Sequence, residues 1–200
     1  MSILHALEIS ELSLAIDIDQ GARIASINFR GFECALPFRG EVLTWGWYAM
    51  APWAGRIKNG KIRSQSGESF QLPTNFAPPH AIHGFGLTSS WEEIGSGAFA
   101  IEFPSPFKGA RAEQRFELLD NALRWSIEYE AGDCDLPFWL GFHPWFPREL
   151  HSGASVEIDF HAGKMFERGS DYLPTGKLIT PTPPPWDDAF TEIQIGRAHV

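Results

Sequence analysis

Glycine and proline recur along the whole chain and divide it into short segments in which apolar and polar residues alternate. The 200 residues include 19 glycines and 15 prolines. Because these residues favour turns, and because alternation with a period of two belongs to β-strands, the pattern predicts an all-β protein. The clearest predicted strands are residues 12–18, 22–29, 99–103, 111–119, 123–129 and 155–160.

The predicted strands are too apolar to form one exposed sheet. Some of them are apolar on both faces, and no helical periodicity is sustained between them. We therefore expect a large antiparallel β sandwich, with two packed sheets. The hydrophobic content of 44% is sufficient for one large core, so we expect a single domain over residues 1–194. The proline-rich stretch 181–186 is expected to be a loop or an edge, because proline cannot donate to a β-ladder.

Two hairpins are predicted from their turn residues. Asn59-Gly60 is a favoured pair for a tight type I′ turn, and a turn there would pair residues 56–58 with residues 61–63. Asp120-Asn121 similarly joins two long alternating runs, residues 111–119 and 123–130. Both hairpins are typical of meandering antiparallel sheets.

The charge balance argues against a polyanionic partner. The chain has 16 Lys and Arg against 25 Asp and Glu, which gives a net charge of -9, so a nucleic-acid backbone would be repelled. Cys34 and Cys134 are the only cysteines and form neither a disulfide framework nor a zinc signature. No window is long and apolar enough for a membrane span, and no signal peptide is recognisable. We expect a cytoplasmic protein whose ligand is a small polar molecule.

The most informative segment for function is Gly141-Phe-His-Pro-Trp-Phe-Pro-Arg148. Taken as a strand from Phe138 to Phe146, one face would carry phenylalanine and leucine and would be core. The other face would carry His143 between Gly141 and Trp145. Indole faces suit the C–H faces of a pyranose, and an imidazole can exchange a proton near neutral pH. The segment therefore suggests a sugar site, although a buried hydrogen-bonded histidine would read the same way.

Three polar clusters lie in comparable aromatic or glycine-rich surroundings. Arg56 follows Pro52-Trp-Ala-Gly, and its guanidinium could grip two vicinal hydroxyls. His80 and His83 precede the glycine turn Gly84-Phe-Gly, and Asp187-Asp188 follows the prolines. Each also has a plain structural interpretation, as a surface arginine, as core histidines or as a solvated turn.

Two other chemistries are disfavoured by the sequence. His80, His83, His143 and Asp187 could supply nitrogen and oxygen ligands, but they do not follow a known metal-ligand spacing, so we expect no metal. A Ser-His-Asp hydrolase is also disfavoured, because the chain has no Gly-x-Ser-x-Gly elbow.

Taken together, these segments resemble the aldose 1-epimerases, also called galactose mutarotases. The resemblance extends over nearly the whole chain and depends on the order and spacing of short motifs. The motifs are Gly21-Ala-Arg-Ile-Ala-Ser-Ile27, Pro52-Trp-Ala-Gly-Arg-Ile-Lys-Asn-Gly60, Ile82-His-Gly84, Gly141-Phe-His-Pro-Trp-Phe146, Leu173-Pro-Thr-Gly176 and Asp187-Asp-Ala-Phe190.

The resemblance implies both a fold and a mechanism. It implies a galactose mutarotase-like sandwich in which His143 is the general acid toward the ring oxygen of a sugar, while Arg56, His83 and Asp187 hold the substrate. Ring opening, rotation at C1 and closure would interconvert the α and β anomers of a free hexose. The resemblance implies no cofactor, since each step is a proton transfer or a bond rotation.

The chain departs from the family pattern near its end. The family takes the anomeric proton with a glutamate well beyond the Asp-x-x-Phe motif, and Glu192 lies too close to Asp187 to be its counterpart. Pro147 stands where many relatives carry asparagine, which leaves the sugar preference open. Residues 195–200 can be back-translated into a common sequencing-adapter sequence, so we expect a non-native tail there. A fragment lacking strands and the base would be poorly soluble and catalytically inactive.

Alternative functions remain compatible with the sequence. A hexose-6-phosphate 1-epimerase of the same fold would need a cationic clamp from Arg63, Arg148 or Lys58. A non-catalytic carbohydrate-binding protein would keep the aromatic platform without the acid and base. A structural β sandwich with buried histidines would use none of these groups. The oligomeric state is left open by the sequence.

Overall fold

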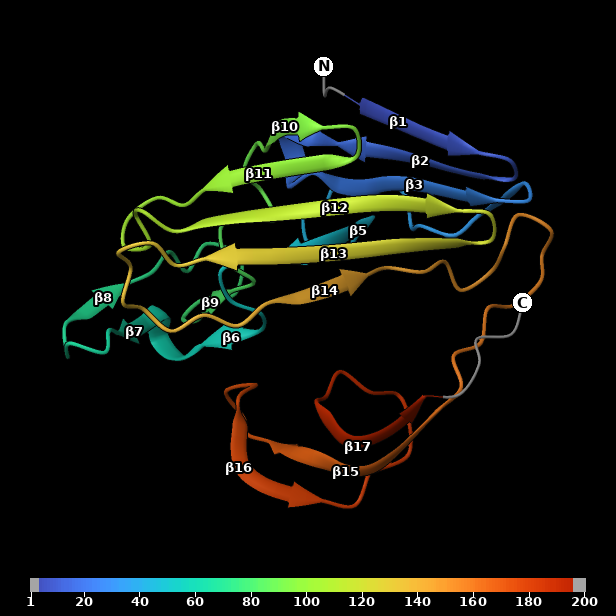
Figure 1. Ribbon diagram of the computed structural model, residues 1–200. Coiled ribbons are helices and arrows are strands. Elements are labelled where there is room, and N and C mark those ends of the chain that lie inside the picture. The colour runs from blue at the N-terminus through green and yellow to red at the C-terminus, as the bar shows by residue number, and fades with distance from the viewer. Residues whose placement is uncertain (1–3, 196–200) are drawn as a thin grey trace. The chain divides into compact units, whose positions relative to one another are not determined.

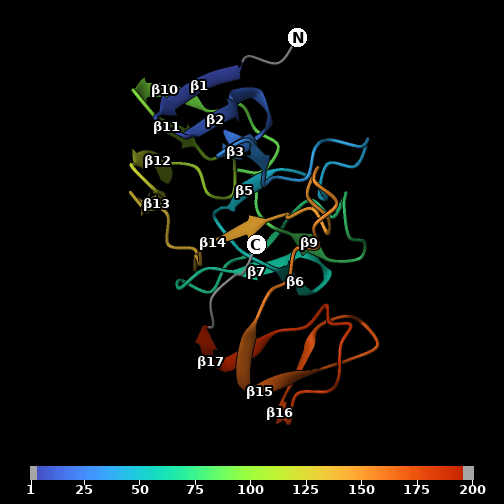
Figure 2. The same cartoon turned by 90° about the vertical axis from the view of Figure 1, so that its right-hand side faces the viewer.

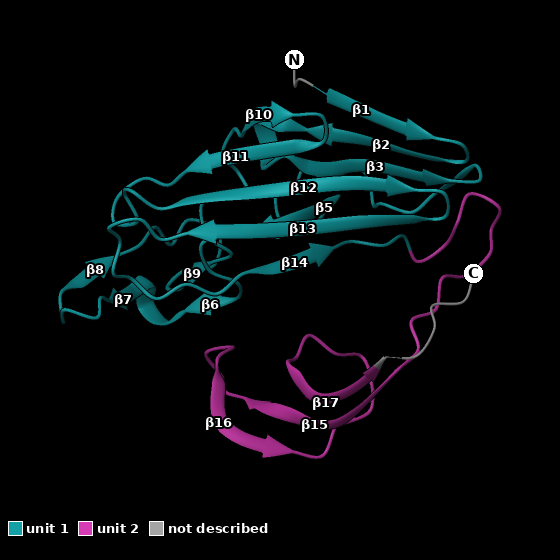
Figure 3. Ribbon diagram, in the orientation of Figure 1, with its two compact units in different colours: residues 1–147 teal, residues 148–200 magenta. Residues whose placement is uncertain are grey.

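The computed structural model describes residues 4–195, and the chain divides into two compact units. The first unit comprises residues 1–147 and the second comprises residues 148–200 (Figure 3). Each unit is described by itself below. The expected single domain over residues 1–194 stays a prediction, and residues 196–200 of the expected tail lie outside the described residues.

The first unit is built from two main antiparallel sheets and two short strand pairs (Figure 1). One sheet contains six strands in the order β1 (Leu4–Ile9), β2 (Leu12–Asp17), β3 (Arg23–Phe29), β5 (Trp47–Met50) and β14 (Gly141–Pro144), with β4 (Phe32–Glu33) paired to β3. The other contains β10 (Glu92–Gly95), β11 (Ala98–Glu102), β12 (Arg111–Leu119) and β13 (Ala122–Glu130). The short pairs are β6 (Arg56–Ile57) with β9 (Ala81–Ile82), and β7 (Lys61–Arg63) with β8 (Ser69–Gln71).

The two main sheets of the first unit face each other across a hydrophobic core, so the predicted sandwich is confirmed. Figure 2 shows them as neighbouring layers. Alternate residues of β2, such as Leu12 and Leu14, point into this core, and Ile24 of β3 is fully buried. Phe99 and Phe116 face them from β11 and β12. The alternation that predicted strands therefore also determines which side chains the sandwich buries.

The second unit contains one three-stranded antiparallel sheet. Its strands are β15 (Phe160–Arg168), β16 (Pro174–Ile179) and β17 (Phe190–Ile195), with β15 in the middle. The rings of Phe160, Trp186 and Phe190 pack edge to face, with centroids 5.3–5.5 Å apart. The proline-rich stretch 181–186 is a loop, as predicted.

The strand predicted at residues 155–160 is wrong. Only Phe160 of this stretch belongs to a strand, and Ser155 makes an isolated bridge to Glu149. The alternation there brings no burial, since the Ile158 side chain is 65% exposed. An alternating pattern without a neighbouring layer to cover it does not form a paired strand.

Within residues 4–195, helical structure is limited to two 3-10 turns, Ile18–Gln20 and Lys58–Gly60. The described part of the chain thus contains no α-helix, in agreement with the absence of helical periodicity in the sequence. None of the helices within residues 4–195 has the length and apolar character needed to cross a membrane.

One predicted hairpin is confirmed and the other is wrong. β12 pairs with β13 across Asp120-Asn121, with Leu119 opposite Ala122. At Asn59-Gly60 both residues adopt positive φ, as a type I′ turn requires, but the flanking strands do not pair with each other.

The reason for the second outcome lies in the partners of the Asn59-Gly60 turn. The Asn59 N–H donates to Nδ1 of His80 at 3.0 Å, and the Gly60 carbonyl accepts from the Leu72 N–H at 2.7 Å. Strands β6 and β7 therefore separate, and each finds its own partner, β9 and β8 respectively. Tertiary hydrogen bonds override the local turn preference.

Gly84 provides a test of the backbone packing that supports the site described below. It has a φ of +76°, and a Cβ placed on it would lie 2.0 Å from the Ala51 carbonyl oxygen. Gly31 has a similar φ of +85° but nothing within 4 Å of such a Cβ. We expect Gly84→Ala to lower the free energy of unfolding by about 3 kcal/mol and Gly31→Ala by about 1 kcal/mol, because only the first adds a steric clash to the backbone strain. Urea unfolding measures both, and equal losses would contradict this account of Gly84.

Candidate functional site

His143 lies on β14 and packs against the neighbouring strand. The strand register places it directly opposite Tyr48 of β5, and the two rings stack with centroids 4.8 Å apart and planes 19° apart. Trp145, two residues further along the chain, is also nearly parallel to the imidazole, at 5.3 Å and 21°. The predicted combination of a histidine with an indole is therefore present. Its main contact, with Tyr48, was not predicted.

The expected core face of this segment is only partly buried, although Leu140 packs against the main core. Strand β14 covers only Gly141–Pro144, and Phe142 and Phe146 are each 40% exposed, whereas His143 and Trp145 are more buried. Phe142 contacts Trp125 of β13, with ring centroids 4.2 Å apart. Because β14 is the last strand in the sheet order, no further strand of the first unit covers its outer edge among the described residues.

His83 is held next to His143 by an unusual backbone conformation. It has a φ of 59°, in the left-handed region that non-glycine residues rarely adopt. Two hydrogen bonds with Gly55 support this conformation: the Gly55 N–H donates to Nδ1 of His83 at 3.1 Å, and the His83 N–H donates to the Gly55 carbonyl at 3.0 Å. The imidazole ring then lies 5.1 Å from that of His143, at an interplanar angle of 76°.

These contacts determine the protonation of His83. Burial, and then the charges of His143 and Arg56, lower its pKa to about 3. The ring is therefore neutral at physiological pH. Because Nδ1 accepts a hydrogen bond, the single ring proton is on Nε2. The site thus offers a fixed N–H donor beside a second histidine.

Arg56 lies on the short strand β6, opposite Ile82 of β9. Arg56 is exposed to solvent, and its positive charge helps to lower the pKa of His83. This pairing of β6 with β9 brings Arg56 and His83 together, although the sequence predicted a different partner for β6. Three of the four predicted site residues, Arg56, His83 and His143, therefore interact in the first unit.

Asp187 lies in the second unit, in the loop before β17. Its side chain is 76% exposed and forms a 3.2 Å ion pair with Arg168, which also donates to the Asp187 carbonyl at 2.8 Å. Arg168 additionally pairs with Asp188 at 3.3 Å. The carboxylate is thus oriented by an arginine within its own unit, and the predicted contact of Asp187 with a sugar stays a prediction.

His80, considered above as a metal ligand, has a structural contact instead. It is buried, and its Nδ1 accepts from the Asn59 N–H at 3.0 Å. Within residues 4–195, no three histidine, cysteine, aspartate or glutamate side chains gather in a way that could hold a metal ion. His80 and His83 thus use the same kind of bond, a ring nitrogen accepting from a backbone N–H, to fix two neighbouring segments.

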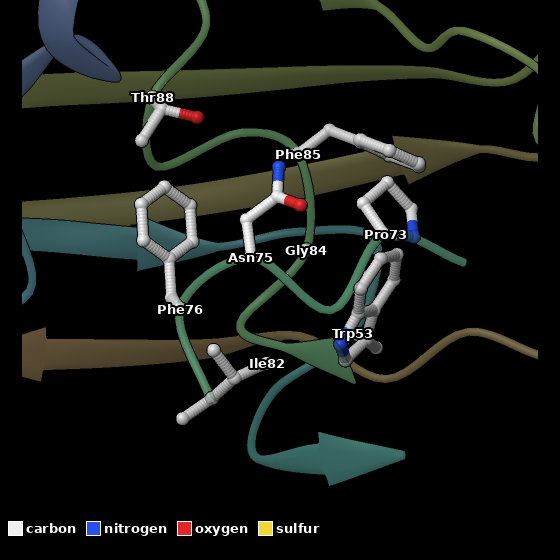
Figure 4. A pocket seen from close by; sticks show the side chains of 8 residues that line it. All are labelled: Trp53, Pro73, Asn75, Phe76, Ile82, Gly84, Phe85 and Thr88. Atoms are coloured by element: carbon white, nitrogen blue, oxygen red, sulfur yellow. The ribbon is translucent and has the colours of Figure 1, made fainter. Parts of the chain in front are cut away.

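A small pocket of about 100 Å³ adjoins the segment that carries His83. Figure 4 shows its lining side chains, with the Asn75 amide and the Thr88 hydroxyl among mostly apolar groups. Ile82 and Gly84, which flank His83 in sequence, both line it. The remaining lining residues are Trp53, Pro73, Phe76 and Phe85. Aromatic rings with a few neutral polar groups suit an uncharged polar ligand.

The sequence did not identify Tyr48 or Arg23 as part of this site. Tyr48 is fully buried, and its hydroxyl donates to the Leu43 carbonyl at 3.1 Å. The Arg23 guanidinium lies over its ring, 4.8 Å from the centroid. Arg23 belongs to a motif that was recognised, but the pairing of β3, β5 and β14 that brings these residues to His143 is not readable from local patterns.

The low pKa of His83 can be measured directly. We expect its imidazole signals to stay unchanged between pH 8 and pH 5 in an NMR titration, with Nε2 protonated throughout, because the folded state takes up the proton only near pH 3. The unfolded chain takes it up below about pH 6.5, so His83 lowers folding stability as the pH falls through that value. A His83→Gln variant assigns the signal. A midpoint near pH 6.5 would contradict this environment for His83.

Known structures share the fold of this chain. A candidate aldose 1-epimerase from Escherichia coli K12 superimposes with a TM-score of 0.74 at 22% identity, covering 92% of this chain and 63% of that protein. A galactose mutarotase-like protein from Clostridium acetobutylicum gives a TM-score of 0.69 at 16% identity, covering 91% and 66% respectively. A protein from Synechocystis sp. PCC 6803 gives 0.72 at 19% identity, covering 100% and 73%.

The chain thus spans less than two thirds of the length of the first two of these proteins. No curated protein sequence matches it at a significant level. The sequence does match the family described as aldose 1-epimerase over residues 6–198. Since that match includes nearly every residue, and since the sandwich fold agrees with it, the chain belongs to the aldose 1-epimerase family.

Proposed function

We propose that this protein interconverts the α and β anomers of a free hexose, as an isomerase that works by proton transfer and ring opening. The observation that supports this most directly is the histidine pair. His83 is a neutral Nε2–H donor whose ring centroid lies 5.1 Å from that of His143. A fixed donor beside a second imidazole suits a substrate whose ring oxygen must be held and protonated.

In the proposed reaction, His143 gives a proton to the ring oxygen of the pyranose while a base takes the proton of the anomeric hydroxyl. The bond between C1 and the ring oxygen breaks, and its electrons go to that oxygen. The C1 hydroxyl becomes an aldehyde. Rotation about the C1–C2 bond and the reverse proton transfers then close the ring to the other anomer.

The remaining residues would hold the substrate. His83 would donate from Nε2 to an oxygen near the ring, and the Arg56 guanidinium would span two hydroxyls. No residue of the chain is assigned as the base, and we propose that the 200-residue chain by itself is therefore inactive, although it keeps the acid.

An uncharged sugar agrees better with the surroundings of His83 than a sugar phosphate does. The pocket beside it is lined by neutral residues. Arg63, one of the cations considered for a phosphate clamp, donates from Nε to the Gly67 carbonyl at 3.0 Å within its own strand pair. These observations favour a free hexose over a hexose 6-phosphate.

Chemical rescue can test the acid and the base together. We expect the chain by itself to give no measurable acceleration of the mutarotation of fresh α-glucose or α-galactose, and added acetate to produce a protein-dependent rate about 10-fold or more above the detection limit, because a small carboxylate can act as the base. His143→Ala should abolish this acceleration, whereas His151→Ala, at an exposed loop position, should keep it. Polarimetry with a buffer-only acetate control measures the rates.

The outcomes of this experiment separate the candidate functions. Full rate in His143→Ala would contradict the proposed acid. Sugar binding without any protein-dependent rate, with or without acetate, would indicate a carbohydrate-binding protein instead.

The affinity for sugar should depend on the planar guanidinium of Arg56, which can donate to two hydroxyls at once. We expect Arg56→Lys to weaken glucose binding about 10-fold without changing the melting temperature, because an ammonium cannot bridge two hydroxyls. Arg39→Lys, another exposed arginine, should leave both unchanged. Calorimetric titration with glucose and with glucose 6-phosphate measures this. Tighter binding of the phosphate by 10-fold or more would favour the hexose-6-phosphate epimerase.

A further inference from the structure

Arg23 is a fully buried arginine in the motif Gly21-Ala-Arg-Ile, to which the proposed reaction assigns no function. Its guanidinium donates four hydrogen bonds to backbone carbonyls of the first unit. The acceptors are Gln20 at 2.8 Å, Val42 at 3.1 Å, Trp45 at 3.0 Å and Leu87 at 2.8 Å. Burial lowers its pKa to about 10, partly opposed by Tyr48 and Asp17, so it is a cation at neutral pH.

A buried cation is costly in a sandwich core, and an apolar side chain of similar length would fill the same space at lower cost. The position of Arg23 gives a reason for the charge. It lies on β3, and its guanidinium carbon is 4.8 Å from the centroid of the Tyr48 ring on β5. Tyr48 in turn stacks on His143 of β14, also at 4.8 Å.

These three residues form a row across adjacent strands. The sheet order is β3, β5, β14, with Ile24 opposite Trp47 and Tyr48 opposite His143. Neighbouring strands are 4.7–4.9 Å apart, so side chains in such a row stack at the spacing that is observed. Because β5 is the middle strand, the guanidinium and the imidazole approach the Tyr48 ring from its two sides.

We propose that Arg23 is a positioning residue for His143, which acts by holding Tyr48 between its guanidinium and the imidazole. Four carbonyls fix the guanidinium, and the Tyr48 hydroxyl is fixed by the Leu43 carbonyl. The Tyr48 ring therefore has little freedom to tilt, and the orientation of the stacked His143 imidazole is fixed by that ring. This inference deepens the proposed function, because it concerns the same histidine.

The row also has an electrostatic consequence. A cation on one side of the Tyr48 ring disfavours a second cation on the other side, so Arg23 opposes protonation of His143. His83 lies next to His143, in the segment after β9, and is neutral at physiological pH. Arg56 of β6 is a further cation near this pair, and its charge lowers the pKa of His83. Asp17, whose charge acts on Arg23, lies at the end of β2. Among these groups, Arg23 is the cation that reaches His143 through an aromatic ring.

An NMR titration of the His143 imidazole in the whole chain tests this inference without requiring catalysis. We expect Arg23→Gln, which keeps a hydrogen-bonding side chain but removes the charge, to raise the measured pKa of His143 by about one pH unit at low salt. Arg23→Lys, which keeps the charge, should change it by much less. Arg39→Gln, at an exposed position, is the matched control and should have no effect.

Two variants of Tyr48 provide a second route if the Arg23 variants do not fold. Tyr48→Leu removes the ring on which the imidazole stacks and should speed the exchange of the His143 ring N–H, because nothing then fixes the imidazole plane. Tyr48→Phe keeps the ring and should preserve the exchange rate. An unchanged titration in Arg23→Gln, or equal behaviour of Tyr48→Leu and Tyr48→Phe, would overturn the inference.

Failure of this inference is distinguishable from failure of the proposed function. If His143 is not the acid, polarimetry of His143→Ala shows it, whatever the titration gives. If Arg23 does not act on His143, the titration shows it, even when His143→Ala abolishes the rate.

Discussion

The packing of two apolar sheet faces is the constraint on which the rest of the first unit depends. The residues that form this core are each at most 5% exposed, and removing them from water is the main favourable contribution to folding: Leu12, Leu14 and Ile24 of one sheet, and Phe99 and Phe116 of the other. This core forces β2, β3, β11 and β12 into fixed layers. Strand β14, which carries His143, is added at the margin of that arrangement as the last strand of its sheet.

The site combines a regular part with a strained part. His143 lies on a paired strand, so its position follows from the register opposite Tyr48. His83 has a positive φ, which costs of order 1–3 kcal/mol and persists only because the surroundings hold it. Gly55 supplies two hydrogen bonds, and Gly84 fits closely against the Ala51 carbonyl. The regular strand therefore fixes one imidazole, and the strained segment brings the other one to it.

Polar groups buried around the histidines determine their chemistry. Nδ1 of His83 accepts a backbone N–H, which leaves Nε2 as the donor, and desolvation keeps the ring neutral. Arg23 satisfies four carbonyls and places a positive charge behind Tyr48. In a largely apolar core, these groups are stable because each has hydrogen-bond partners.

The sequence by itself determined the all-β class, the sandwich, the hairpin at Asp120-Asn121 and the segments around Arg56, His83, His143 and Asp187. These features depend on alternation, turn residues and short motifs, which are local. Only the tertiary structure decided that β6 and β7 separate at Asn59-Gly60, that Phe142 lies on a partly exposed face, and that Tyr48 and Arg23 stand behind His143. The physical reason is that strand partners and registers are chosen by hydrogen bonds and packing between residues far apart in the chain, which local propensities do not encode.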